Sequence, residues 1–168
     1  MTDVQISAPP GVPQITTEAE FDAPRYLVFR AFMEPDLLSQ WLGPRRVTMT
    51  IEEYDPRDGG RYHYTHHDGE GNEYAFRGVF HGDPSLEGAV QTFEYEGAPG
   101  HVSLETLTLE DAGAGTRVRT NSLYQSVQDR DAMIEADMET GVREGMERLE
   151  VLLEKLKRES SGGTARAA

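Results

Sequence analysis

The C-terminal third of the chain carries a long amphipathic pattern that constrains the fold more than any other feature. From Val127 to Glu159, apolar residues recur at steps of three and four, which is the spacing of one face of an α-helix. The second half of this stripe is rich in leucine, which suits permanent packing. The first half offers methionine, glycine and alanine, which leave space beside a helix. The pattern therefore predicts a helix that closes a core at one end and covers a cavity at the other.

Charge and composition exclude several classes of partner. The 168 residues suit one domain, and their formal net charge is −14, from 30 acidic and 16 basic residues. Nucleic acids and anionic membranes both require a basic surface, so we expect neither as a partner. The chain has no cysteine, which excludes disulfides, thiol nucleophiles and cysteine-based zinc sites. With no secretory signal and no apolar run of about 20 residues, we expect a cytoplasmic monomer or homodimer without membrane contact.

The rest of the chain is predicted to form one strand, two short helices and then a run of strands. Apolar and polar residues alternate over 14–21, and Pro24 and Pro35 each suit the start of a short helix. Turn residues divide the middle of the chain into six predicted strands, at 47–54, 61–67, 73–81, 89–96, 101–110 and 116–124. An antiparallel meander packed against one amphipathic helix is an α+β arrangement, and a curved sheet that grips a helix encloses space for a ligand.

The two ends of the chain differ from this middle part. Residues 1–13 contain three prolines and are predicted to be a flexible arm. Residues 160–168 are small and polar with nothing to bury, so we expect a disordered tail. A single domain is therefore expected over residues 14–159.

Several motifs in this order resemble a known family. They are FDAPRYLVFRAF at 21–32, LSQWLGP at 38–44, DGGRY at 58–62, YAFRG at 74–78, TFEYEG at 92–97, GTRV at 115–118 and GVREGMERL at 141–149. Together they resemble the Hsp90-ATPase-activator-like branch of the START/Bet v 1-like (SRPBCC) superfamily, over about residues 14–157. The resemblance implies a helix-grip fold, in which a curved antiparallel sheet wraps around a long C-terminal helix. The family includes carriers of hydrophobic ligands, cyclase relatives, antibiotic-sequestering proteins and co-chaperone domains.

One departure from the family pattern lies in the final helix. Many relatives have Gly-Trp near its middle, where this chain has Gly141-Val142. The loss of an indole there implies a wider or differently lined cavity.

Aromatic residues at alternating strand positions are candidates for the cavity wall. By alternation, the aromatic residues within each of three strand segments share a face. With residues from the helices they give this set of predicted ligand-binding residues: Trp41, Tyr62, Tyr64, Phe76, Phe80, Phe93, Tyr95, Met138 and Val142. The alternative is that each of them is an ordinary core residue.

Glu105 is the candidate for acid–base chemistry. It shares a strand face with Leu107 and Leu109, so it points into the cavity if that face is the inner one. Leu104 on the other face is also apolar, which leaves the facing open. A structural or exposed glutamate, an ion pair with an arginine such as Arg77 or Arg119, and a catalytic group with a raised pKa are the three alternatives.

The run His63, His66 and His67 invites a comparison with metal sites. Positions 63 and 67 of a strand lie about 13 Å apart, too far for one ion, and position 66 lies on the other face. We therefore expect no metal and no cofactor. The chain also lacks the sequence motifs of serine hydrolases, P-loops, dinucleotide-binding folds and zinc proteases.

Three functions follow as hypotheses. The first is binding of a small hydrophobic or aromatic molecule between sheet and helix. The second is a cyclase or hydratase that uses Glu105 with a tyrosine or histidine as acid and base. The third is a chaperone-accessory module that contacts another protein.

Overall fold

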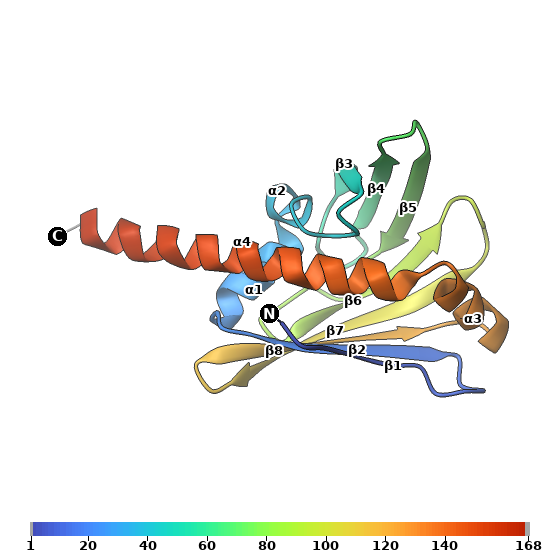
Figure 1. The fold of residues 1–168 in the computed structure, drawn as a ribbon, viewed down its shortest axis with the longest axis horizontal. Helices are drawn as coiled ribbons and strands as arrows, with labels where there is room; N and C mark the ends of the chain where they lie inside the picture. Colours follow the sequence, from blue (N-terminus) through green and yellow to red (C-terminus); the bar gives the residue numbers. More distant parts are fainter. Residues whose placement is uncertain (1, 167–168) are drawn as a thin grey trace.

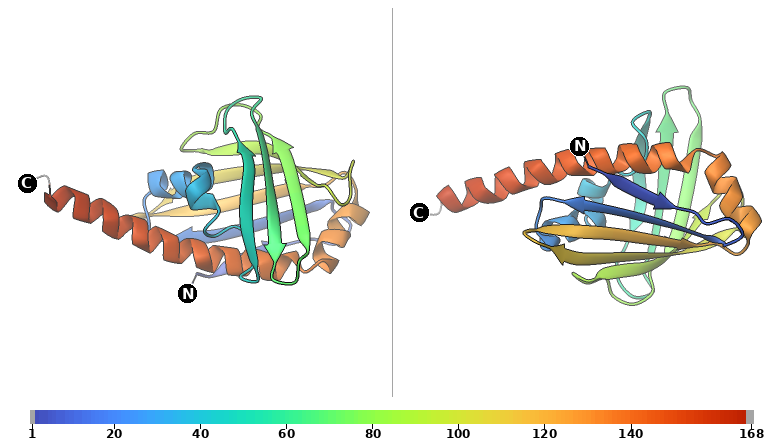
Figure 2. Two further views of the ribbon diagram at one scale, coloured as in Figure 1. Left: turned by 90° about the horizontal axis from the view of Figure 1, so that it is seen from above. Right: turned by 60° about the horizontal axis from the view of Figure 1, so that its bottom comes forward.

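The chain forms one eight-stranded antiparallel sheet with a long helix lying across it. The computed structural model describes residues 2–166, with side chains described for 2–162. In the sheet the strands follow the order β1-β2-β8-β7-β6-β5-β4-β3, and α4 crosses the sheet and extends beyond it (Figures 1 and 2). The strands are β1 Val4–Ser7, β2 Gln14–Phe21, β3 Val47–Tyr54, β4 Arg61–Asp68, β5 Glu73–Val79, β6 Gly88–Tyr95, β7 Val102–Ala112 and β8 Gly115–Leu123. The helices are α1 Arg25–Met33, α2 Pro35–Leu38, α3 Val127–Glu135 and α4 Met138–Arg166.

The predicted α+β helix-grip architecture is confirmed. Strands β3 to β8 form an unbroken meander, and β2 closes onto β8 from the start of the chain. Turn chemistry at the strand ends sets this order, because glycines such as Gly59 and Gly71 adopt the positive φ that tight turns require. No helix in the described part of the chain is both long and apolar enough to cross a membrane.

The single long helix expected from Val127 is two helices. Ser126 caps α3, since its Oγ accepts a hydrogen bond from the backbone N–H of Asp129 at 3.0 Å. Asp137 then takes a left-handed backbone conformation, with φ of 61°, which ends α3 and lets α4 begin in a new direction. The prediction of continuity was wrong because no glycine or proline marks this break.

Both predicted tails contain regular structure. Within residues 1–13, Val4–Ser7 pairs with β2, and Val4 is buried, so this segment is an edge strand and not a flexible arm. Helix α4 continues through residues 160–166, where disorder was expected, because an established helix adds each further residue at little cost. Residues 167–168 of that predicted tail lie outside the described residues.

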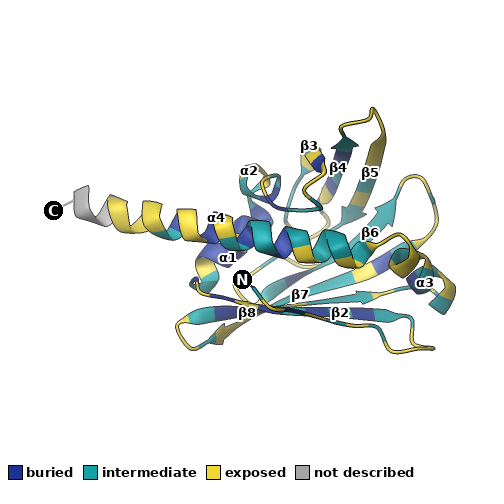
Figure 3. Cartoon of the chain, in the orientation of Figure 1, coloured by how far each residue is buried: buried dark blue, intermediate teal, exposed yellow. Residues whose placement is uncertain are grey.

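The main core lies between α1 and the leucine-rich half of α4. Val28 and Leu149 are fully buried there, and Leu153 is 2% exposed. Figure 3 shows this buried region where α1 meets α4. The leucine half of the stripe therefore packs as predicted.

The glycines in the first half of the stripe serve a different purpose from the one expected. A Cβ on Gly145 would lie 3.4 Å from the carbonyl oxygen of Trp41, and one on Gly141 would lie 3.5 Å from Cδ of Pro44. The space beside these glycines is occupied by the loop between α2 and β3. Gly141 and Gly145 therefore allow this loop to pack closely against α4 and do not border an open cavity.

Candidate functional site

A row of aromatic side chains crosses the inner face of the sheet, the face turned toward the helices. Tyr64 on β4 lies opposite Phe76 on β5, and Phe76 lies opposite Tyr95 on β6. The Tyr64 and Phe76 ring centroids are 5.3 Å apart, and Phe76 lies 5.4 Å from Tyr95. Phe76 also stacks on Phe93 at 5.3 Å. Phe76, Phe93 and Tyr95 remain half-buried, although they lie on the face that the helices cover.

Four of the predicted wall residues are core residues, among them Tyr64, which is 7% exposed. Phe80 is fully buried, and Trp41 and Tyr62 are each 2% exposed. The Trp41 indole N–H donates to the carbonyl of Ala31 at 2.9 Å, and the Tyr62 hydroxyl donates to the carbonyl of Thr92 at 2.5 Å. The polar groups of Trp41 and Tyr62 therefore already donate hydrogen bonds to backbone carbonyl oxygens.

The two predicted helix residues lie at the open end of α4. Met138 is the first residue of α4 and is half-buried. Val142, one turn further, is half-buried and packs against the main core. The aromatic row belongs to a second core cluster around Tyr62, Tyr64 and Phe80, so Val142 and Trp41 pack with a different cluster.

Glu105 points to the inner face, which decides the question of its orientation. Each carboxylate oxygen accepts one serine hydroxyl: Ser103 Oγ lies 2.6 Å from Oε1, and Ser122 Oγ lies 2.5 Å from Oε2. The predicted arginine partners lie elsewhere, because Arg77 pairs with Glu94 and Arg119 with Glu18. The ion-pair alternative for Glu105 is therefore wrong.

Burial raises the pKa of Glu105 and of two tyrosines. Desolvation raises the pKa of Glu105, and the hydrogen bonds from Ser103 and Ser122 partly oppose that rise. Burial also raises the pKa of Tyr64 well above its usual value, with the charge of Glu105 as a further cause. Burial and the same charge raise the pKa of Tyr124 to about 12. The charge of Glu105 is therefore a secondary cause of the raised pKa of both tyrosines.

The three histidines of the predicted run point to different places. His63 on the outer face lies between two carboxylates, with Nδ1 3.1 Å from Glu52 and Nε2 2.8 Å from Glu96. His67 hydrogen-bonds Thr50 through Nε2 at 2.9 Å. Among the residues that the structure describes, no group of three or more side chains is arranged to hold a metal ion.

His66 is the inner histidine, and it extends the aromatic row. Its ring centroid lies 5.3 Å from those of Tyr64 and Phe76, and its Nε2 is buried without a hydrogen-bond partner. Burial and the nearby Arg148 charge lower its pKa to about 4, so the ring is neutral near neutral pH. Sequence alternation assigns its face, but nothing in the sequence indicates that Nε2 lacks a partner.

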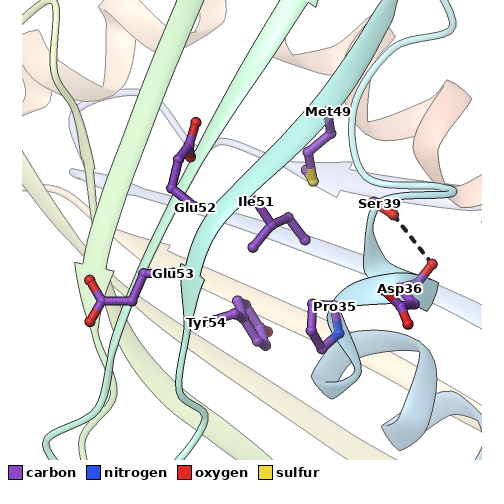
Figure 4. A pocket seen from close by; sticks show the side chains of 8 residues that line it. All are labelled: Pro35, Asp36, Ser39, Met49, Ile51, Glu52, Glu53 and Tyr54. Atoms are coloured by element: carbon purple, nitrogen blue, oxygen red, sulfur yellow. Dashed lines mark hydrogen bonds between the residues drawn. The ribbon is translucent and has the colours of Figure 1, made fainter.

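A pocket of about 370 Å³ opens between α2 and the edge strand β3. Met49, Ile51 and Tyr54 line one side of it, and Pro35 and Asp36 line the other (Figure 4). The three β3 residues also pack against the aromatic cluster, so this pocket borders the predicted site from the sheet edge. Sequence reasoning missed it, since the pairing of α2 with β3 depends on tertiary contacts.

A second pocket, of about 390 Å³, lies on the outer side of β4 to β6. Charged side chains, including Arg61, Arg77 and Glu94, are among those that line it. Neither pocket lies between α4 and the predicted wall residues.

Comparisons with known proteins agree with the fold. Residues 22–154 match the family model described as "Activator of Hsp90 ATPase homolog 1-like protein". A crystal structure of protein Ms6760 from Mycobacterium smegmatis superposes with a TM-score of 0.82 at 20% identity, covering 91% of this chain and 97% of that one.

Two further solved structures have similar scores. A protein from Rhodobacter sphaeroides gives a TM-score of 0.83 at 25% identity, covering 91% of this chain and 99% of that one. A solution structure from Arthrobacter aurescens gives 0.83 at 24% identity, covering 90% and 91%. No curated protein matches this chain.

Proposed function

This chain belongs to the Activator of Hsp90 ATPase homolog 1-like protein family, and we propose that it binds a small, largely aromatic molecule on the inner face of its sheet. One observation carries the proposal: Phe76, Phe93 and Tyr95 stay half-buried on the face turned toward the helices. Binding of a ligand over partly exposed apolar surface is favourable, because that surface is removed from water. Met138 at the start of α4 is half-buried too and would contact the same ligand.

Polar groups beside the aromatic row support this proposal. Phe93 lies opposite Ser103 in the sheet, and Glu105 lies two residues along the same strand, opposite Ser122. Small-molecule sites typically combine an apolar wall with a few polar groups that orient the ligand. The inner face has both components side by side.

The enzyme hypothesis has less support from the geometry. A proton relay needs a second titratable side chain within about 3 Å of Glu105. The side-chain hydrogen bonds of Glu105 in the described part of the chain go to two serines, which do not titrate in the useful range. Binding without chemistry is therefore favoured.

The protein-interaction hypothesis needs a continuous apolar patch of several hundred Å². Large exposed apolar side chains occur on separate elements: Val12, Tyr26, Tyr74, Leu86, Leu104, Leu123, Ile134 and Val151. Apart from the paired Leu104 and Leu123, they are scattered along the chain. This distribution does not favour a protein partner over a small ligand.

Titration with naphthalenemethanol, a neutral aromatic probe, tests the binding function. Amide and methyl NMR shifts are expected to move around Phe93, Tyr95 and Met138. A Phe93→Ala variant should weaken binding several-fold, because aromatic contacts contribute about 0.5–1.5 kcal/mol each.

The matched control is Tyr26→Ala, which removes an exposed ring on α1. That variant should leave the affinity unchanged. Shifts confined to the pocket between α2 and β3, or equal effects of the two variants, would contradict the proposed site.

A further inference from the structure

Glu105 is held by two serine hydroxyl groups, one at each oxygen of its carboxyl group. The two hydroxyl groups, at 2.6 and 2.5 Å, are compatible with a carboxylate that accepts one hydrogen bond on each oxygen. A carboxylate has about four acceptor positions, so two serines leave capacity for further donors. Among the described residues, no lysine, arginine or histidine lies within ion-pair distance of this carboxylate.

Aromatic rings lie on the same surface as this charge. Burial raises the pKa of Tyr62 and of Tyr64, and the charge of Glu105 is a further cause in both. Phe93 lies opposite Ser103, one of the two serines that hold Glu105. The faces of aromatic rings attract cations, and a nearby carboxylate adds to that attraction.

We propose that the ligand is an arylalkylamine in its ammonium form, with its ring on Phe76 and Phe93 and its ammonium group at Glu105. This inference rests on the binding function proposed above and specifies the class of ligand. The formal charge of −14 on the chain adds a long-range attraction for cations and repels anions. A bound cation would also be the counterion that Glu105 does not have among the described residues.

Three probes of nearly equal shape test the inference by calorimetry at low ionic strength. They are naphthylmethylamine, which is cationic, naphthalenemethanol, which is neutral, and naphthylacetate, which is anionic. The amine is expected to bind about tenfold or more tightly than the alcohol, because hydrogen bonds to charged groups exceed neutral ones by this margin. Naphthylacetate should bind most weakly.

Glu105→Gln is the decisive variant, since it keeps the shape and removes the charge. It should abolish the preference for the amine, so that the amine and the alcohol bind this variant with similar affinity. Glu110→Gln makes the same change on an exposed residue of the same strand and should keep the preference. Circular dichroism of both variants verifies that each is folded.

The outcomes separate the two proposals. Equal binding of amine and alcohol by the unmodified protein would overturn the amine inference and leave the binding function standing. An unchanged amine preference in Glu105→Gln, or an equal loss in Glu110→Gln, would also overturn it. Failure of all three probes to bind would overturn the binding function and the inference with it.

Discussion

The two ends of α4 meet the rest of the protein in opposite ways. At the leucine-rich end, Leu149, Leu152 and Leu153 pack against α1 and are at most 5% exposed. At the other end, Met138 and Val142 are half-buried. One helix is therefore tightly packed at one end and more loosely packed at the other. The difference separates the residues that stability constrains from those that we propose for recognition.

Leu149→Ala should have the largest effect, and it acts at the closed end. Removing a fully buried leucine costs about 2–5 kcal/mol through lost transfer free energy and the cavity left behind. Urea unfolding measures the loss. Probe affinity of the protein that remains folded should not change, and a parallel loss of affinity would show that the two ends are coupled.

Gly43→Ala acts at the boundary between the two ends. Gly43 has φ of 102°, and an added Cβ would lie 2.7 Å from Cε1 of His66. We expect a loss of about 1–3 kcal/mol from backbone strain and overpacking, measured by thermal unfolding. Gly141→Ala is the control, because its Cβ would meet Pro44 at an ordinary 3.5 Å and alanine favours the helix. Equal destabilisation by both substitutions would contradict this account of the loop.

Val142→Trp is directed at the open end. The indole should occupy space that a bulky ligand needs and weaken naphthalenemethanol binding by about tenfold, or 1.4 kcal/mol. Calorimetry measures the change. Val142→Leu, which adds little volume, should retain most of the affinity. An unchanged affinity in the tryptophan variant would show that this turn of α4 does not cover the ligand.

Glu105→Gln should have the smallest effect on stability, and its sign is informative. The pKa of Glu105 is raised in the folded state, so the folded protein holds this proton more tightly than the unfolded chain does. The stabilisation is present at pH values below the unfolded pKa and is lost as the pH rises through the folded pKa. The glutamine variant should therefore be slightly more stable than the unmodified protein at neutral pH.

Thermal unfolding over a pH series measures this difference, which should vanish toward acid pH. A variant that is less stable at neutral pH would show that the two serine hydrogen bonds outweigh the cost of burying the charge.

Much of the fold could be predicted from local patterns in the sequence. Alternation within residues 47–54 and turn residues such as Gly71 identify the meander, because a half-buried strand repeats every two residues. The leucine stripe ending at Leu156 identifies the closed core. The break at Asp137 was missed, since aspartate adopts the left-handed conformation without a distinctive motif.

The site was less predictable, because it depends on register and long-range packing. Alternation alone left the face of Glu105 open, and the pairing of Glu105 with Ser122 across β7 and β8 decides it. The loop that fills the space beside Gly145 comes from residues about a hundred positions away in the chain. Contacts of this kind leave no local trace in the sequence.

The position of Trp41 has a practical consequence for spectroscopy. It is the one tryptophan in the chain, 2% exposed, with its ring 4.7 Å from that of Phe32 in the closed core. Its fluorescence should follow unfolding of the α1–α4 core and respond weakly to events at the aromatic row. The protein thus contains an optical reporter of folding that is separate from its proposed recognition surface.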